Sequence, residues 1–376
     1  MPGHPARLCD SSSHPHAGIH ALGQPRYTGA FMKGIQQDSL ERYFADHVEG
    51  SKPPLSISMI KGGHSNLTYL VEDAAGRKRV LRRPPTGAVL ATAHDMAREH
   101  RILTGLANSA VPVPRTLALC EDPSVNDAPF YVMDYVEGVV LTTPEQAASI
   151  VPEAKREALG LDVIEILAHL HNLEPNDVSL GDLGRREAYL ARQLKRWKIQ
   201  WEKSKTRELP FMEEAHAALE AKMPEQEGSA IVHGDFRMGN FLVNGPAGRI
   251  EAILDWELCT LGDPLADVGY VMNDWNGPGD DRPTSSGTGQ SAVSCGGFPD
   301  RKILLARYEE LTGKSTRGID YYRAFQYWRL AAIVEGVLSR YLKGVMGEDA
   351  DTEIFRAQID SLAEAAVELV HSDAIS

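Results

Sequence analysis

The sequence lacks any apolar run that reaches the roughly 18 residues of a membrane-spanning helix. Its N-terminus also lacks the order of a signal peptide, in which a basic segment precedes an apolar one. Cysteine is scarce, and no two cysteines form the CxxC pair that would indicate a zinc site or a dense disulfide framework. These absences predict a protein that is neither inserted in a membrane nor secreted, with the reducing cytoplasm as its location.

Basic residues are also fewer than acidic residues. Lysine and arginine total 39 against 52 acidic residues, which gives a formal net charge of −13. That balance argues against a general nucleic-acid or anionic-membrane surface, although a local basic pocket remains compatible with it. With 376 residues, 43% apolar and 24% charged, the composition is ordinary for a globular protein with a substantial core.

The chain divides into three parts by pattern. Residues 1–31 are rich in Pro, Gly, Ser and His without any period, which predicts a disordered tail. Residues 32–137 carry five strand-like runs and one inserted helix, Ala91–Ala107, and form the expected small nucleotide-covering lobe. Residues 138–376 have helix-period apolar stripes, interrupted only around Ala230–Asp255, and form the expected catalytic and substrate-binding lobe. The expected class is therefore α+β, with two lobes: a small five-stranded antiparallel sheet with one helix, and a mainly helical remainder.

The most informative segment is IVHGDFRMGNFLVNGPAGRIEAILDWE, from Ile231 to Glu257. In the kinase pattern a catalytic-loop Asp accepts the proton of the acceptor hydroxyl, an Asn five residues later holds Mg²⁺, and a second metal-binding Asp follows on the next hairpin. Asp235, Asn240 and Asp255 fit these three positions. His233 is expected to brace the loop through hydrogen bonds without reacting itself.

The small lobe should supply a cation for the α/β-phosphates of ATP and an acid that orients it. Alternation along RVLRR places Val80 and Arg82 on one face of the strand, so Arg82 is the predicted cation and Glu99, on the following helix, its predicted partner. Arginine at this position departs from the lysine usual among kinases. A guanidinium can clamp phosphate bidentately, but it is bulkier than an ammonium group. The alternative is a solvated strand arginine and a surface glutamate.

Further nucleotide contacts are expected from backbone and small side chains. Gly62 and Gly63 permit close approach of the backbone to phosphate, and Ser65, Asn66 and Thr68 can donate hydrogen bonds; the alternative is a simple hairpin connection. Adenine should meet the backbone of Asp134 to Val136, with Met133 lining the pocket or serving as plain core.

Two more acids follow Asp255, at Asp263 and Asp267. Additional carboxylates would overfill a Mg²⁺ site that also holds phosphates and waters. Asp267 is therefore expected to cap backbone NH groups of the catalytic loop. The polar loop 277–297 could gate the substrate cleft or be a flexible insertion.

These segments resemble the aminoglycoside phosphotransferase-like kinases, which share the protein-kinase-like fold. The similarity spans about Ser39 to Glu368. The stretches LRRPPTG, VPVP, FYVMDYVEG, HGDFRMGN and LDWELCTLGDPLADVGY are most similar to the kinase-like domains related to those fused to acyl-CoA dehydrogenases. The resemblance implies ATP- and Mg²⁺-dependent phosphorylation of a small hydroxylated metabolite, for which a hydroxyacyl-CoA or a related hydroxy acid is a candidate.

Two other functions remain open at this point. Antibiotic kinases of the same superfamily bind polycationic sugars, which the net negative charge would tolerate. Yet the helix expected around Tyr189–Lys205 is basic and aromatic, and with Trp197 and Trp201 it could suit an anionic, partly flat acceptor such as a CoA ester; the alternative is a solvated basic helix with its tryptophans in the core. The third possibility is a pseudokinase-like nucleotide-binding module in which Arg82 has replaced a needed lysine. The sequence fixes no oligomeric state.

Overall fold

A five-stranded antiparallel sheet forms the first part of the computed structural model, which describes residues 32–60, 66–86, 95–276, 280, 282–284, 290–344 and 351–372. The strand order in the sheet is β1-β2-β3-β5-β4. Residue Arg82 lies in the centre of the sheet, opposite Thr68 on one neighbouring strand and Tyr131 on the other. The strands are β1 (Ser56–Met59), β2 (Leu67–Glu72), β3 (Lys78–Arg83), β4 (Thr116–Cys120) and β5 (Phe130–Asp134).

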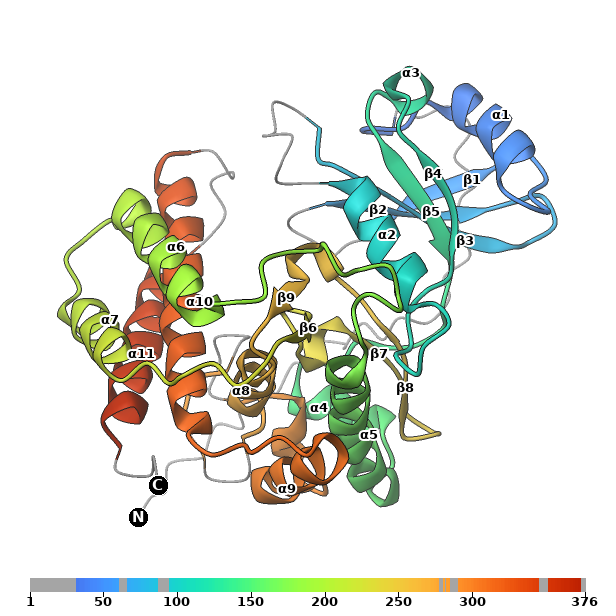
Figure 1. The fold of residues 1–376 in the computed structure, drawn as a ribbon. Coiled ribbons are helices and arrows are strands. Elements are labelled where there is room, and N and C mark those ends of the chain that lie inside the picture. Colours follow the sequence, from blue (N-terminus) through green and yellow to red (C-terminus); the bar gives the residue numbers. More distant parts are fainter. Residues whose placement is uncertain are drawn as a thin grey trace, which may run out of the picture.

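The two faces of this sheet pack against different helices (Figure 1). Helix α1 (Gln37–His47) covers one face, where Leu40 and Phe44 share a hydrophobic cluster with Val132. Helix α2 (Met96–Leu106) belongs to a second cluster, with Tyr131 and the helical part of the molecule. Because successive strand side chains point to opposite faces, Tyr131 and Val132 serve different cores. A short helix α3 (Pro123–Asn126) precedes β5.

The rest of the chain is mainly helical and holds two small strand pairs. Strands β6 and β9 form one antiparallel pair, and β7 and β8 form the other. The strands are β6 (Ala230–Val232), β7 (Phe241–Asn244), β8 (Arg249–Ile253) and β9 (Thr260–Gly262), joined by 3₁₀ turns η1 (Met238–Asn240) and η2 (Trp256–Leu258), with a third, η3 (Ala292–Cys295), farther on. The helices are α4 (Pro144–Ile150), α5 (Glu153–Asn172), α6 (Tyr189–Ser204), α7 (Pro210–Ala221), α8 (Leu265–Asn273), α9 (Arg301–Thr312), α10 (Ile319–Leu342) and α11 (Thr352–His371).

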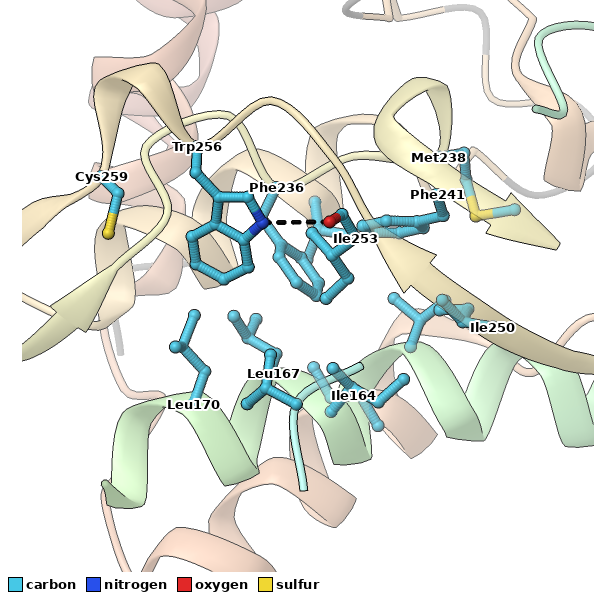
Figure 2. Packing of buried hydrophobic residues seen from close by; sticks show 14 of the residues in the cluster. Ile164, Leu167, Leu170, Phe236, Met238, Phe241, Ile250, Ile253, Trp256 and Cys259 are labelled. Atoms are coloured by element: carbon cyan, nitrogen blue, oxygen red, sulfur yellow. Dashed lines mark hydrogen bonds between the residues drawn. The ribbon is translucent and has the colours of Figure 1, made fainter. Parts of the chain in front are cut away.

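Helix α5 supports the strand pair that carries the predicted catalytic segment. Figure 2 shows Ile164, Leu167 and Leu170 of α5 facing the buried apolar side chains of that segment. Trp256 lies in the same core and donates a hydrogen bond from its indole nitrogen to the Ile253 carbonyl, at 3.0 Å. Phe236 is one of the apolar residues that alternate with polar ones in the catalytic segment. It packs into this core and anchors the loop, while the polar residues stay available on the other side of the loop.

The predicted fold class is confirmed. The helix expected around Tyr189–Lys205 is α6, which begins at Tyr189 and ends at Ser204. Gln226 accepts the Tyr189 N–H at 2.9 Å and donates to the Arg186 carbonyl at 2.7 Å, which holds the turn that precedes the helix. Helix α7 begins at Pro210, where proline suits the first helical position. Helices α4 and α8 were not predicted. The expected tail, residues 1–31, lies outside the described residues.

Candidate active site

The catalytic-loop backbone between β6 and β7 is held by side chains. Asp267 of α8 accepts the N–H groups of His233, at 2.6 Å, and of Gly234, at 2.9 Å. His233 is fully buried, and its Nδ1 lies 3.1 Å from the Asp235 nitrogen while its Nε2 lies 3.0 Å from the Leu254 carbonyl oxygen. The Asp235 N–H must donate to Nδ1, so the proton of the neutral ring belongs on Nε2, where it donates to Leu254. Asp267 and His233 thus hold the backbone of the loop through these hydrogen bonds.

Asp267 keeps its charge in spite of complete burial. Burial by itself would raise the pKa of this carboxyl group, but the hydrogen bond and charge of His171, together with His233 and the Gly234 N–H, lower the pKa overall. His171 in turn contacts the Tyr308 hydroxyl, at 2.8 Å. The neighbouring Asp263 is also buried, and it accepts hydrogen bonds from the Tyr322 hydroxyl and the Leu265 N–H. Both acids therefore have structural partners.

Asp235 and Asn240 lie against each other. The Asn240 amide nitrogen donates to the Asp235 carboxylate at 2.6 Å and to its backbone carbonyl at 2.8 Å. The Arg237 Nε lies 3.4 Å from the other carboxylate oxygen of Asp235, whose side chain is 20% exposed. The structure therefore leaves the Asp235 carboxylate partly open to solvent, with two donors directed at it.

Asp255 stands at the end of β8 in a left-handed backbone conformation, with φ 66° and ψ 59°. Asp and Asn tolerate this region better than most residues, since their short polar side chains hydrogen-bond locally. Its carboxylate accepts a hydrogen bond from Arg82 Nη2 at 2.6 Å. Arg82 therefore joins the centre of the five-stranded sheet to the segment that follows β8.

Arg82 is surrounded by acids. Its Nε lies 3.0 Å from Glu99 Oε2, and its Nη2 lies 3.9 Å from Glu257 Oε2. Burial alone would lower the pKa of the guanidinium, but Tyr131, Glu99 and Asp255 raise it above its usual range, so Arg82 stays charged. Burial raises the pKa of Glu99, and the charge of Arg82 and the hydrogen bond from Tyr131 offset that effect only in part.

Asn66 is the member of the predicted phosphate-covering turn that the structure describes. It is buried, and its amide nitrogen donates to Glu99 at 2.9 Å and to Glu257 at 3.4 Å. The predicted contacts at Gly62, Gly63 and Ser65 lie outside the described residues. Thr68 lies on β2, opposite Arg82.

The predicted adenine-contacting residues lie at the end of β5. Met133 is buried on the α2 side of the sheet. The Asp134 carboxylate lies 2.9 Å from the Arg115 Nε, and Val136 follows in an irregular segment that leads to the helical part. The expected gating loop, 277–297, is described only at residue 280, at 282–284 and from 290 onward, where η3 forms.

Three residues at the site escaped sequence reasoning. Glu257 joins the Arg82 cluster, Arg237 lies beside Asp235, and Arg329 of α10 donates to the Gly234 carbonyl at 2.8 Å. The position of Arg237, two residues after Asp235, was visible in the sequence as a cation beside the expected base. No sequence pattern indicated Glu257 or Arg329, because their contacts join segments that are distant in the chain.

The donor set fits a magnesium ion. Asn240 uses its amide nitrogen for Asp235, and no hydrogen bond within the described part of the chain occupies its Oδ1. Asp255 likewise engages one carboxylate oxygen with Arg82. Among the described residues no group of three or more His, Cys, Asp or Glu side chains could hold a metal ion. Mg²⁺ is usually bound by one or two carboxylates together with substrate phosphates and waters, so two protein oxygens suffice.

A basic surface lies on helix α6. Its residues border a shallow recess of about 450 Å³ with an exposed isoleucine, Ile199, in the middle; the lining residues are Arg192, Lys195, Arg196, Ile199, Gln200 and Lys203. Trp197 is partly buried and lies under two guanidinium groups, those of Arg196 and Arg329, at 5.4 and 5.5 Å from the ring centre. Within the described ranges, no helix has the length and apolar character needed to cross a membrane.

The sheet, the helical body and this cluster of an aspartate, an asparagine and a second aspartate define a kinase-like phosphotransferase. The model of the phosphotransferase enzyme family that includes the aminoglycoside phosphotransferases matches residues 56–287. Acyl-CoA dehydrogenase family member 10 of Mus musculus is 34% identical over 353 residues, which cover 93% of this chain and 32% of that protein. The chain belongs to the phosphotransferase enzyme family. It spans about a third of the length of the mouse relative.

Solved structures give the same assignment. A protein of Ralstonia eutropha JMP134, provisionally assigned as an aminoglycoside phosphotransferase, is 32% identical with a TM-score of 0.75, covering 89% of this chain and 98% of that one. Spectinomycin phosphotransferase in complex with ADP and spectinomycin shares the fold, with a TM-score of 0.58 at 13% identity, covering 89% of this chain and 98% of that one. The predicted resemblance and the predicted enzyme class, a phosphotransferase that uses a hydroxyl acceptor, are confirmed at the level of the family.

Proposed function

We propose that this protein transfers the γ-phosphoryl group of ATP, in the presence of Mg²⁺, to a hydroxyl group of a small metabolite. One observation carries the proposal: the Asp235–Asn240 pair and the Asp255–Arg82 pair bring together the polar groups that phosphoryl transfer needs. Such transfer depends on positioning and on charge neutralisation more than on covalent chemistry. The family assignment supports the reaction type, and the residue roles below are part of the proposal.

Asp235 acts as the general base. Its carboxylate accepts the proton of the acceptor hydroxyl while that oxygen forms a bond to the γ-phosphorus and the bond between this phosphorus and the β,γ-bridging oxygen breaks, releasing ADP. Asn240, hydrogen-bonded to the same carboxylate at 2.6 Å, and Arg237 restrict its rotation. The buried scaffold of His233 and Asp267 holds the loop that carries Asp235, so the base is positioned before substrates arrive.

Asn240 Oδ1 and the Asp255 carboxylate are the proposed magnesium ligands. When bound, Mg²⁺ neutralises charge on the phosphate oxygens. Arg82 supplies the protein's own cation for the phosphates of ATP, and Glu99 orients it through the contact of 3.0 Å at its Nε. A phosphate would compete with Asp255 for the Nη2 group. A reducing cytoplasm, where ATP is available, is part of this proposal.

The acceptor that the surface of α6 favours is anionic. Four cations border the recess on α6, and no acidic side chain is among its lining residues. A polycationic aminoglycoside would meet repulsion there, whereas a hydroxyacyl-CoA or another hydroxy acid would meet attraction. We therefore place a hydroxyacyl-CoA ahead of an aminoglycoside, and both ahead of a nucleotide-binding module without turnover, since the chain keeps Asp235, Asn240 and Asp255, the three residues to which this proposal gives catalytic roles.

The test is Mg²⁺-dependent ADP release with two acceptor panels, hydroxyacyl-CoA esters and aminoglycosides, for the wild type and for Asp235→Asn. Removing a general base typically costs 10² to 10⁴ in rate, so we expect kcat to fall by at least about 10²-fold. Asp182→Asn is the matched control: Asp182 is an exposed aspartate that forms an ion pair with the surface residue Arg101, and its variant should turn over normally.

Equal rates in the wild type and Asp235→Asn would refute the assigned base. Aminoglycosides as the better panel would overturn the anionic acceptor and leave the phosphotransferase in place. Binding of Mg·ATP without turnover on either panel would favour the binding-module alternative.

A further inference from the structure

Arg329 is a buried cation whose charge has no acidic partner among the residues that the structure describes. It lies in the middle of α10 and is 6% exposed. Among the described residues no carboxylate oxygen lies within 4.0 Å of its nitrogens. Burying an unpaired charge is costly, and such groups are rare unless other interactions compensate or a function requires them. The surroundings of Arg329 therefore need an explanation.

Its partners are neutral and come from α10 itself and from three other segments. The Arg329 Nη2 donates to the Gly234 carbonyl at 2.8 Å, and its Nη1 donates to the Gln326 side-chain oxygen at 2.9 Å. The rings of Trp197 and Tyr270 lie 5.5 and 5.7 Å from the guanidinium carbon, on α6 and α8 respectively. Cation–π contacts of this kind favour a desolvated guanidinium. Its Nε is buried without a hydrogen-bond partner within the described residues.

The Gly234 carbonyl belongs to the peptide unit that directly precedes Asp235. Asp267 accepts the N–H groups of His233 and Gly234, and His233 accepts that of Asp235. Asn240 donates to the Asp235 carbonyl. Arg329 donates to the Gly234 carbonyl, so the peptide plane between Gly234 and Asp235 is held at both its oxygen and its nitrogen.

The same side chain extends the link to the basic surface of α6. Trp197 stacks under both Arg196, which lines the recess, and Arg329, which reaches the catalytic loop. A movement of α6 would therefore be transmitted to the Gly234 carbonyl through the Trp197 ring and the Arg329 guanidinium group.

We propose that Arg329 is a positioning residue for the catalytic base, which fixes the peptide before Asp235 and joins it to the acceptor-side helix α6. This inference rests on the proposed function, in which Asp235 is the base. Arg329 touches neither the acceptor nor the transferred phosphoryl group in this role.

The test compares Arg329→Gln and Arg329→Lys with the wild type in Mg·ATP turnover, first with water and then with the best acceptor of the panels. A displacement of the base by about 1 Å can cost about 10²-fold, so we expect kcat to fall by between about 10-fold and 100-fold in Arg329→Gln while the KM for ATP stays nearly constant. Arg329→Lys, which keeps a charge and a donor, should fall between the two.

The control is Arg323→Gln on the same helix. Arg323 is equally buried, but its partners are Asp320 and Asn273, away from the catalytic loop. It should lose thermal stability while its kcat stays close to that of the wild type. If Arg329→Gln behaves like Arg323→Gln while Asp235→Asn is inactive, the positioning role is wrong and the proposed function stands. If Asp235→Asn is as active as the wild type, the proposed function fails first.

Discussion

Arg82 illustrates how one side chain can serve both stability and ligand binding. It contacts Glu99, Asp255 and Glu257, and Asn66 donates to two of these acids. Both Arg82 and Glu99 are largely buried, so each charge depends on the other. A phosphate group that enters the site would compete with Asp255 for the Nη groups and leave the Glu99 contact intact.

The variant Arg82→Met should be strongly destabilised in a pH-dependent manner. Removing one member of a buried ion pair costs about 3 to 5 kcal/mol, which we expect in the free energy of unfolding at neutral pH. Without Arg82, the pKa of Glu99 should rise further above its unfolded value. A raised pKa contributes stability that is fully present below the unfolded pKa and is lost as pH rises through the folded pKa, so the deficit should be larger at about pH 8 than at about pH 5.

Urea titrations at both pH values measure this difference. Lys78→Met, on the same strand and face but exposed, is the control and should stay within about 0.5 kcal/mol of the wild type at either pH. A deficit in Arg82→Met that does not depend on pH would show that Glu99 does not take up a proton.

At the scale of elements, helices α8 and α10 hold the catalytic loop in place. Asp267 on α8 and Arg329 on α10 bind opposite sides of the same loop. The two helices approach closely at Gly269, where an added Cβ would lie 2.7 Å from the Tyr322 Cβ and 2.9 Å from the Tyr322 carbonyl carbon. Backbone atoms cannot move aside as a flexible side chain can, so this glycine sets the spacing between the helices.

Gly269→Ala should therefore destabilise the protein by about 2 kcal/mol, within the range for overpacked cores. Gly336→Ala is the matched control: on α10 its Cβ would meet nothing nearer than the Gln200 side chain at 3.7 Å. There the higher helix propensity of alanine should raise stability by about 0.5 to 1 kcal/mol. Thermal unfolding of both variants checks the pair, and a neutral Gly269→Ala would mean that the helices can separate without cost.

Sequence periodicity recovered the elements that have one buried face. Alternation along β3 separated Val80 and Arg82 from Leu81, and those two faces meet different helices. Helix α8 was missed because almost every one of its residues is buried, which leaves no apolar stripe to detect. The local spacing of Asp235 and Asn240 was visible in the chain. Glu257 was not, because its partner Asn66 is 191 residues away and only the fold brings them together.

At the scale of the whole molecule, the nucleotide should bridge the sheet and the helical body. Arg82 comes from the sheet, whereas Asn240 and Asp255 come from the body, and the proposed Mg²⁺ ion needs the latter two. A ligand that binds only the folded state stabilises it by about 2.7 kcal/mol at 100 times its Kd.

We expect Mg·ADP to raise the unfolding temperature, and EDTA to remove most of that increase in the wild type. Asp255→Asn should show only the small, EDTA-insensitive increase that ADP gives without metal. The protein without nucleotide, with and without EDTA, is the control and should unfold at one temperature. Equal ADP effects in the presence and absence of EDTA would argue against a metal held by Asn240 and Asp255.

The hydrophobic cluster that contains α2 continues from the sheet into the helical body, while the α1 face has a cluster of its own. Met96, Tyr131 and Met133 thus share their packing with α5 and the β7–β8 pair. Dividing the chain where the sheet ends would cut through this shared hydrophobic core and would expose apolar surface on both fragments. Expression of the five-stranded sheet and its helices by themselves would therefore require a redesign of that apolar surface.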